Sequence, residues 1–172
     1  MRKQQSGFTL IELIVVMVIV GLLAAVAVPK FLDVTKKAEA ASVKNILGSV
    51  RSALSLKVAS GLVNGVDIAT WAFDGGDDAL DPMNDLLADA PESYVGIKTI
   101  RASGDKGSWW DRNLSASDHW LMYRVKNESI ITGGWQASTN PHIISRIKLL
   151  EEDGENVGLT LDATSYPYTW NE

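Results

Sequence analysis

A long apolar run near the N-terminus dominates the hydrophobic pattern of this chain. Within residues 8–28 only Thr9, Glu12 and Gly21 interrupt the apolar side chains, and residues 13–28 carry no polar side chain. A helix of about 20 residues rises roughly 30 Å, which matches the hydrocarbon thickness of a bilayer. The pattern therefore predicts a helix over residues 8–30 that is long and apolar enough to span a membrane.

The residues around this run indicate its orientation and argue against a simple anchor. Arg2 and Lys3 precede it, which favours a cytoplasmic N-terminus and places the rest of the chain outside. A charge inside a membrane costs on the order of 2.5–3.5 kcal/mol, so Glu12 indicates a charged partner. A plain anchor and a secretory signal peptide are the alternatives, although a signal peptide has a shorter apolar region of about 7–15 residues.

The periodicity changes after Pro29 to that of an amphipathic helix. Apolar residues recur at spacings of three and four, as they do on a helix with one face on a core. They are Val43, Ile46, Leu47, Val50, Ala53, Leu54, Val58 and Leu62. We predict that the helix continues over residues 31–63 and that Gly61 and then Asn64-Gly65 end it. Pro29 lacks a backbone donor and should kink or locally open the helix.

The C-terminal part of the chain shows the alternation and turn signals of strands. We predict strands over residues 94–100, 119–125, 129–132 and 157–161, with 143–150 either a strand or a short helix. In this prediction 129–132 pairs back on 119–125, and 157–161 pairs back on 143–150 across a turn at residues 153–156. The aromatic tail, residues 166–170, should dock. The whole predicts an α+β fold, with an antiparallel sheet of three to five strands on the C-terminal half of the helix and a globular region over 64–172.

Composition and charge exclude several kinds of chemistry. Lys plus Arg number 16 and Asp plus Glu number 21, a net charge of −5. Nucleic acid is not an expected partner, because phosphates must be neutralised by basic groups. The chain has no cysteine, which excludes disulfides and thiolate chemistry. His119 and His142 lie far apart without a local nucleophile, so we expect surface or interface histidines and no enzyme.

Two acidic segments are candidate calcium sites. Asp74, Asp77, Asp78 and Asp81 provide carboxylate oxygens in a glycine-containing loop, and calcium takes such ligands from flexible loops. Their spacing does not match an EF-hand, and a solvated acidic loop without metal is the alternative. The second candidate consists of Glu151, Glu152, Asp153 and Glu155.

Six tryptophans are many for 172 residues. They are Trp71, Trp109, Trp110, Trp120, Trp135 and Trp170. Core packing or contacts between subunits account for most of them, and an exposed Trp109-Trp110 pair could instead bind sugar or a cell surface.

The residues that open the apolar run resemble a known processing motif. Gly7-Phe8-Thr9-Leu10-Ile11-Glu12, behind a short basic leader, is similar to the cleavage and methylation motif of type IV prepilins and of the pseudopilins of type II secretion. The resemblance covers roughly residues 1–35. It implies that prepilin peptidase removes residues 1–7 by cutting between Gly7 and Phe8, and that Phe8 is N-methylated. It also implies that Gly21 and Pro29 bracket a part of the helix that can unwind in filaments.

The resemblance implies a structural subunit of a type IV pilus-like filament, a helical homo-oligomer used in adhesion, motility or surface attachment. Within it, the ammonium group of Phe8 can pair with Glu12 of a neighbouring subunit, which offsets part of the desolvation of both charges. Before assembly the chain would sit in the inner membrane at an assembly platform, and afterwards in an extracellular filament. A pseudopilin of a type II secretion system, or a minor pilin acting as adhesin or DNA-binding module, is the alternative. Major pseudopilins bind calcium, which adds weight to the calcium prediction.

Overall fold

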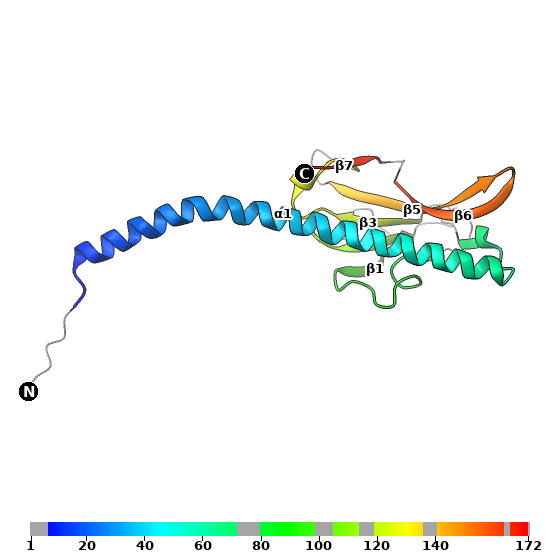
Figure 1. The fold of residues 1–172 in the computed structure, drawn as a ribbon, viewed down its shortest axis with the longest axis horizontal. Coiled ribbons are helices and arrows are strands. Elements are labelled where there is room, and N and C mark those ends of the chain that lie inside the picture. Colours follow the sequence, from blue (N-terminus) through cyan, green and yellow to red (C-terminus); the bar gives the residue numbers. More distant parts are fainter. Residues whose placement is uncertain are drawn as a thin grey trace, which may run out of the picture. The chain divides into compact units, whose positions relative to one another are not determined.

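The structure is a computed structural model that describes residues 7–71, 80–98, 105–113, 119–135, 141–163 and 166–171. The chain forms two compact units, Met1–Ala38 and Glu39–Glu172, and we call the second unit the head. One helix, α1 (Leu10–Val63), belongs to both units, which confirms the long predicted helix (Figure 1).

Within the head, one face of α1 is buried at the predicted spacing. Its buried residues are Val43, Leu47, Val50, Leu54, Val58 and Gly61. Leu62, which the pattern placed on this face, is instead 50% exposed. Gly61 lies on this buried face in its place, because the helix continues through it to Val63. The prediction that Gly61 helps to end the helix is therefore wrong. A Cβ atom at Gly61 would lie 2.5 Å from the Trp71 ring, so glycine permits this close approach.

The helix ends where Asn64-Gly65 was predicted to end it. Gly65 has a φ of +67°. The Val66 amide donates to the Gly61 carbonyl at 2.9 Å, and the Gly65 amide donates to the Leu62 carbonyl at 3.3 Å. These two bonds form a Schellman motif, which satisfies carbonyls that the helix end leaves without partners.

A five-stranded sheet shares its core with α1, which confirms the α+β fold. Its strands are β1 (Tyr94–Lys98), β2 (Trp109–Asn113), β3 (His119–Arg124), β5 (His142–Glu152) and β6 (Glu155–Asp162), in the order β1-β2-β3-β5-β6. The β1–β2 pair is parallel, and the other pairs are antiparallel. A separate two-stranded sheet joins β4 (Ile131–Gly133) to β7 (Tyr168–Trp170), so the aromatic tail docks as predicted. Two short 3-10 helices, η1 (Ile68–Trp71) and η2 (Glu128–Ile130), complete the described elements.

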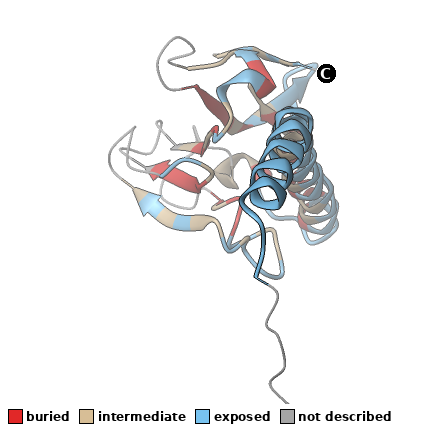
Figure 2. Cartoon of the chain, turned by 90° about the vertical axis from the view of Figure 1, so that its left-hand side faces the viewer, coloured by how far each residue is buried: buried red, intermediate tan, exposed pale blue. Residues whose placement is uncertain are grey.

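Two predictions about the strands are corrected. Residues 129–132 do not pair with β3, because β2 and β5 occupy both of its edges and β4 pairs with β7 instead. Strand β2 was not predicted, because Trp-Trp-Asp-Arg-Asn lacks alternation of apolar and polar residues. Its residues Trp109 to Arg112 are nevertheless all buried, and Figure 2 shows the buried stretches of the head in red.

The β5–β6 hairpin confirms the predicted pairing of residues 143–150 with 157–161. Its turn consists of only Asp153 and Gly154, whose φ angles are +53° and +84°. Positive φ at both positions is typical of a type I′ turn, whose twist matches that of the flanking strands. Glu155 and Asn156, which were predicted to lie in the turn, therefore belong to β6.

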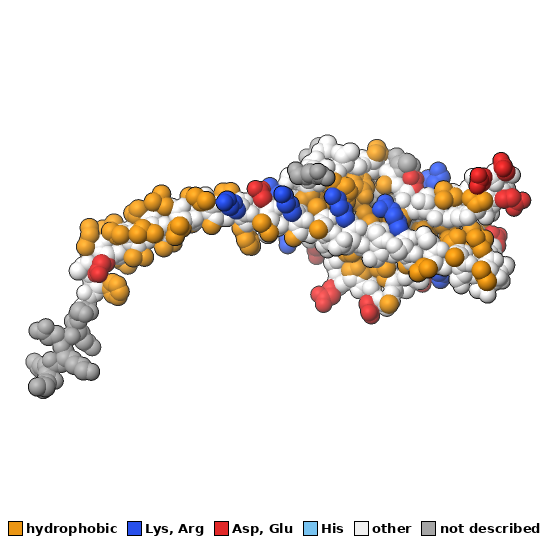
Figure 3. All heavy atoms as spheres, in the orientation of Figure 1, with side chains coloured by type: hydrophobic (Ala, Val, Ile, Leu, Met, Phe, Trp, Pro, Cys, Tyr) orange, Lys and Arg blue, Asp and Glu red, His pale blue; other side chains and the backbone are white. Residues whose placement is uncertain are grey.

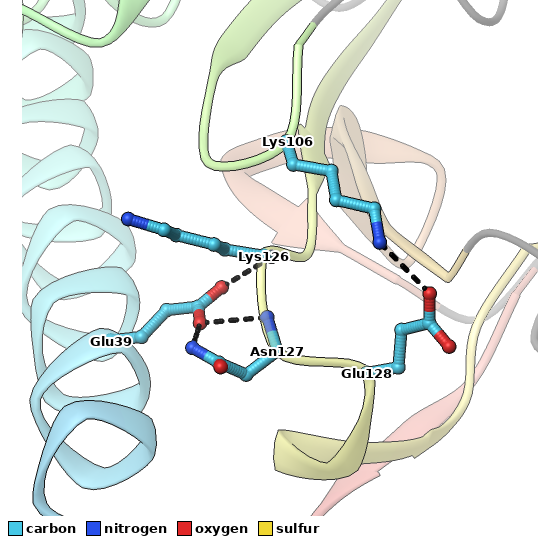
Figure 4. A network of polar contacts seen from close by, with 5 residues as sticks. All are labelled: Glu39, Lys106, Lys126, Asn127 and Glu128. Atoms are coloured by element: carbon cyan, nitrogen blue, oxygen red, sulfur yellow. Dashed lines mark hydrogen bonds and ion pairs between the residues drawn. The ribbon is translucent and has the colours of Figure 1, made fainter. Parts of the chain in front are cut away.

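A carboxylate on α1 joins the helix to the loop that follows β3 (Figure 4). Glu39 accepts hydrogen bonds from the Lys126 amide at 2.6 Å, the Asn127 amide at 2.9 Å and the Tyr123 hydroxyl at 3.0 Å. The Asn127 side-chain amide donates a further bond to Glu39. Nearby, Lys106 and Glu128 form an exposed ion pair at 3.1 Å. The single Glu39 carboxylate thus satisfies two backbone amides of a loop and positions that loop against α1.

The close approach at Gly61 leads to a first prediction. Gly61→Ala should destabilise the head by about 1–3 kcal/mol, because overpacking against Trp71 outweighs the gain in helix propensity. Urea unfolding of the full chain in detergent, followed by tryptophan fluorescence, measures this, since all six tryptophans lie between residues 71 and 170. Gly48→Ala is the matched control. Gly48 lies on the same helix with no described atom within 4 Å of an added Cβ, so alanine there should stabilise by about 0.5–1 kcal/mol.

Candidate functional site

The peptide bond between Gly7 and Phe8 lies in non-helical backbone directly before α1. Both residues are exposed, and the Phe8 side chain is 91% exposed. A Cβ at Gly7 would have no described atom within 4 Å, so packing within the subunit does not require glycine there. Arg2 and Lys3 lie outside the described residues. The predicted cleavage site is therefore an accessible, non-helical segment that another protein can bind.

Glu12 forms a reciprocal cap at the start of α1. The Thr9 amide and hydroxyl donate to Glu12 Oε2 at 3.0 and 2.9 Å, and the Glu12 amide donates to Thr9 Oγ1 at 3.3 Å. This arrangement is a capping box, with Thr9 at the N-cap and Glu12 three residues later. Its signal, Thr-x-x-Glu before an apolar run, is in the sequence and was not used in the sequence analysis. Glu12 therefore already has a role within one subunit, that of ordering the first turn of α1.

The apolar part of α1 is exposed along its whole length. Its large apolar residues from Leu10 to Val34 are between 47% and 76% exposed. An 18-residue window of the helix has a mean hydropathy of 3.0, and no residue in that window is buried. Figure 3 shows hydrophobic side chains covering this part of the helix. By length and composition it can cross a membrane, and an apolar surface of this size indicates a membrane or protein contact.

Gly21 and Pro29 both lie inside the continuous helix. Of the two effects predicted for Pro29, a kink or a local opening, the local opening is not present in this structure. A Cβ at Gly21 has no described atom within 4 Å, so no contact within the described chain requires glycine there. The role of these two residues in helix flexibility stays a prediction about the assembled state.

The first predicted calcium site falls mostly outside the described residues, which include only Asp81 of its four carboxylates. Asp81 accepts hydrogen bonds from the Met83 amide at 2.8 Å, from the Asn84 side chain at 2.7 Å and from the Tyr94 hydroxyl at 2.8 Å. Burial, followed by the bond to Asp81, raises the pKa of Tyr94, so its hydroxyl remains a donor. Calcium binding at Asp74, Asp77, Asp78 and Asp81 stays a prediction.

The second acidic set lies at the end of the β5–β6 hairpin. Glu151, Glu152, Asp153 and Glu155 are all exposed. Among the residues that the structure describes, no group of three His, Cys, Asp or Glu side chains is placed to hold a metal ion. The hairpin therefore presents negative charge to solvent.

Several buried polar groups were not predicted. Asp111 on β2 is 2% exposed, and its Oδ1 atom has no hydrogen-bond partner. Burial, together with the negative charge of Asp81, raises the pKa of Asp111 to about 7, against a smaller lowering by the Arg112 amide. No local signal in the sequence distinguishes this aspartate from a surface one, because its position in the middle of the sheet, between β1 and β3, is set by pairing with other parts of the chain.

The expectation of a surface or interface histidine is wrong for His142, and the exposed tryptophan pair is not found. His142 is fully buried, with edge-on ring contacts to Trp110 at 5.5 Å and Trp135 at 5.0 Å between centroids. Trp109 and Trp110 are 1% and 0% exposed, so they belong to the packing on the two faces of the sheet. The His119 side chain lies outside what the structure describes.

Comparison with known proteins assigns the family. The family described as "Prokaryotic N-terminal methylation motif" matches residues 2–28. A type IV major fimbrial protein of Dichelobacter nodosus is 35% identical over 124 residues, which cover 68% of this chain and 78% of that protein. The chain belongs to the type IV pilin family. This pilin has further similarity to proteins of two kinds of assembly, in each case over a shorter stretch.

A type IV narrow pilus major component of Thermus thermophilus is 52% identical over 51 residues, 30% of this pilin and 44% of that protein. The type II secretion system core protein G of Pseudomonas aeruginosa is 44% identical over 55 residues, 32% of this pilin and 39% of that protein. The pilin thus matches less than half the length of these two relatives. No solved structure matches it significantly. The names of the relatives describe components of filaments and of a secretion system.

Proposed function

We propose that this chain is a structural subunit of a type IV pilus-like filament, which polymerises through its apolar helix after cleavage between Gly7 and Phe8 and N-methylation of Phe8. The observation that carries the proposal is the combination of an exposed Gly7-Phe8 bond with a helix whose apolar surface is unburied directly after it. The head has a hydrophobic core of its own, to which, among the residues that the structure describes, only those from position 40 onward contribute. The apolar segment is therefore available for a membrane before assembly and for other subunits after it.

The proposed partners follow from this order of events. Prepilin peptidase would cleave and methylate the chain at the cytoplasmic face, and an inner-membrane assembly platform would move it into the filament. The chain would then change from a single-pass protein of the inner membrane, with its N-terminus cytoplasmic, to part of an extracellular filament. A pseudopilin of a type II secretion system is the second candidate, and the match to core protein G supports it over about a third of the chain.

The experiment that tests the proposal is intact mass spectrometry of protein sheared from cells. A species that begins at N-methylated Phe8 and dominates the sheared fraction is expected. The same species confined to membranes would favour the pseudopilin. An N-terminus at Met1 or after Ala27 would overturn the proposal, because the leader cleavage on which it depends would not have occurred.

Glu12 provides a second test, because the cap requires a side chain that accepts hydrogen bonds, whereas the proposed assembly contact requires its negative charge. In the filament we propose that its carboxylate pairs with the methylated ammonium group of Phe8 of a neighbouring subunit, where neither charge is stable alone. Glu12→Gln keeps a capping side chain, since glutamine also serves at this position of a capping box. It removes only the charge, whereas Glu12→Val removes both functions.

Both variants are expected to insert and be processed normally but to yield at least tenfold less sheared filament. The measurement is the amount of pilin in the sheared fraction relative to the membrane fraction. Normal filament yield from Glu12→Gln would show that only the cap matters and would contradict the charge pairing.

A further inference from the structure

The β5–β6 hairpin ends in a ribbon that the rest of the head does not cover. From residue 150 to residue 157 every residue is exposed, including Leu150 at 45% and Val157 at 46%. Four carboxylates lie in or beside its two-residue turn, and Figure 3 shows acidic side chains gathered at this end of the molecule. A two-stranded hairpin without further cover is of marginal stability, and this one presents both apolar and acidic groups. Its chemistry indicates a partner that is both apolar and positively charged.

The head carries a surface with these two properties elsewhere, formed by Lys44, Arg51, Tyr168 and Trp170. We call it the cation–aromatic surface. Lys44 and Arg51 are exposed on α1 and lie seven residues apart, so they point to nearly the same side of the helix. The Lys44 ammonium lies 5.0 Å from the centroid of the Trp170 ring. The Tyr168 and Trp170 rings are in edge contact at 5.5 Å, and both are half-buried.

A hollow lies beside these aromatic rings. It has a volume of about 320 Å³ and is lined by Ala163, Pro167, Tyr168 and Trp170. Burial raises the pKa of Tyr168, and the positive charge of Arg51 lowers it. Apolar walls, with a lysine in contact with one of the lining rings, suit a segment that carries leucine or valine next to carboxylates.

We propose that the acidic end of the β5–β6 hairpin of one subunit docks on the cation–aromatic surface of a second copy of this chain. The inference rests on the proposed filament function and deepens it. The acidic end of the hairpin and β7 lie at opposite ends of the head in Figure 1, so one chain cannot make this contact with itself. A contact between two different surfaces of identical subunits is heterologous, and such contacts generate open helical filaments. With a net charge of −5 per chain, copies repel one another unless acidic groups meet cations at defined places.

Cysteine cross-linking tests the proposed contact directly, because the chain has no cysteine of its own. Gly48 lies on α1 between Lys44 and Arg51, is exposed and has open space around it. Full-length chains carrying Gly48→Cys and Asn156→Cys are co-expressed, and sheared filaments are treated with a short bismaleimide. A cross-linked dimer is expected only when both variants are present. Ser42→Cys replaces Gly48→Cys in the matched control. Ser42 is exposed and lies on nearly the opposite side of α1 from Lys44 and Arg51.

Charge exchange tests whether the contact drives assembly. Lys44→Glu with Arg51→Glu is expected to lower the sheared-filament yield at least tenfold. Adding Glu152→Lys and Glu155→Lys to the same chain should restore most of that yield, which a folding defect at Lys44 or Arg51 would not allow. Reversal of two other exposed acids, Asp89→Lys with Glu92→Lys, is the control and should leave the yield unchanged.

The outcomes separate this inference from the proposed function. Two results would overturn the hairpin contact and leave the filament function intact. In both, wild-type cells form normal filaments, but the cross-linking is no greater than in the Ser42→Cys control, or charge exchange fails to rescue the yield. Wild-type cells without sheared, processed subunits would overturn the proposed function itself. Specific cross-linking together with rescue would establish the contact.

Discussion

Asp111→Asn is expected to stabilise the head above pH 7 while leaving its stability at pH 4 almost unchanged. The wild-type carboxyl is nearly fully buried, with one oxygen lacking a hydrogen-bond partner, and the charge of Asp81 is close enough to oppose its ionisation. Its pKa rises from 3.8 to about 7 in the folded chain. Deprotonation therefore occurs in the unfolded chain at a lower pH than in the folded chain.

The direction in which the stability changes with pH follows from these two pKa values of Asp111. A group whose pKa is raised by folding contributes its full stability below the unfolded pKa, near 3.8, and loses it as pH rises through about 7. At about 1.4 kcal/mol per pH unit, the loss for Asp111 amounts to roughly 4 kcal/mol as an upper value. Asparagine cannot ionise, so the variant should lack this loss and should exceed wild type in stability above pH 7.

Urea unfolding at pH 4, 5.5, 7 and 8.5, followed by tryptophan fluorescence, measures the difference between the two chains. Subtracting one curve from the other removes the titration of all other groups. Glu92→Gln, at an exposed loop position, serves as the control and should show wild-type pH dependence. Equal stabilities of wild type and Asp111→Asn at pH 8.5 would contradict a buried carboxyl that is forced to ionise.

The elements that the sequence predicted correctly are those specified by local signals. The spacing from Val43 to Val58 locates the buried face of α1, because a helix repeats its contacts every three to four residues. The β5–β6 hairpin follows from the turn signal at Asp153-Gly154, which lies between two apolar-rich segments, although residues 143–150 were predicted as either a strand or a short helix. Both patterns depend on residues within one turn or one pair of strands, so no knowledge of distant contacts was needed.

The elements that the sequence did not predict depend on distant partners. The sequence of strand β2 is polar after Trp110, so it gives no local sign of a buried strand. The strand is identified only by its pairing with β1 and β3. In the same way, β4 finds its partner in β7, which begins 35 residues after β4 ends. Asp111 and His142 are buried although no nearby residue marks either as a core position, and the His142 ring contacts Trp110 from another strand.

In the candidate site, too, features encoded by short segments could be predicted, whereas contacts between distant residues could not. The Gly7-Phe8 motif and the apolar helix were predicted because cleavage and membrane insertion are read from short, continuous segments. The cap formed by Thr9 and Glu12 was available from a four-residue pattern but was not recognised. The cation–aromatic surface brings Lys44 together with Trp170, which are 126 positions apart, so only the folded chain identifies it.

Glu39→Ala is expected to destabilise the head by about 3–5 kcal/mol, the second large effect. Glu39 is half-buried and accepts hydrogen bonds from two backbone amides, an asparagine side chain and the Tyr123 hydroxyl. Hydrogen bonds to a charged acceptor contribute about 1.5–3 kcal/mol each, and partially buried donors that lose their acceptor add a desolvation cost. Burial, together with the negative charge of Glu39, raises the pKa of Tyr123, so its hydroxyl stays protonated as a donor.

The matched control for this prediction lies in the same loop. Glu128→Ala removes the ion pair with Lys106, in which both side chains are about half exposed, and should cost no more than about 1 kcal/mol. Glu39→Gln keeps an acceptor oxygen without the charge and should fall between wild type and Glu39→Ala. Urea unfolding of the three variants at pH 7 gives this order. If Glu39→Ala lost no more stability than Glu128→Ala, then the bonds from α1 to residues 126–127 would not position the loop. The fold of the head would in that case depend on apolar packing alone.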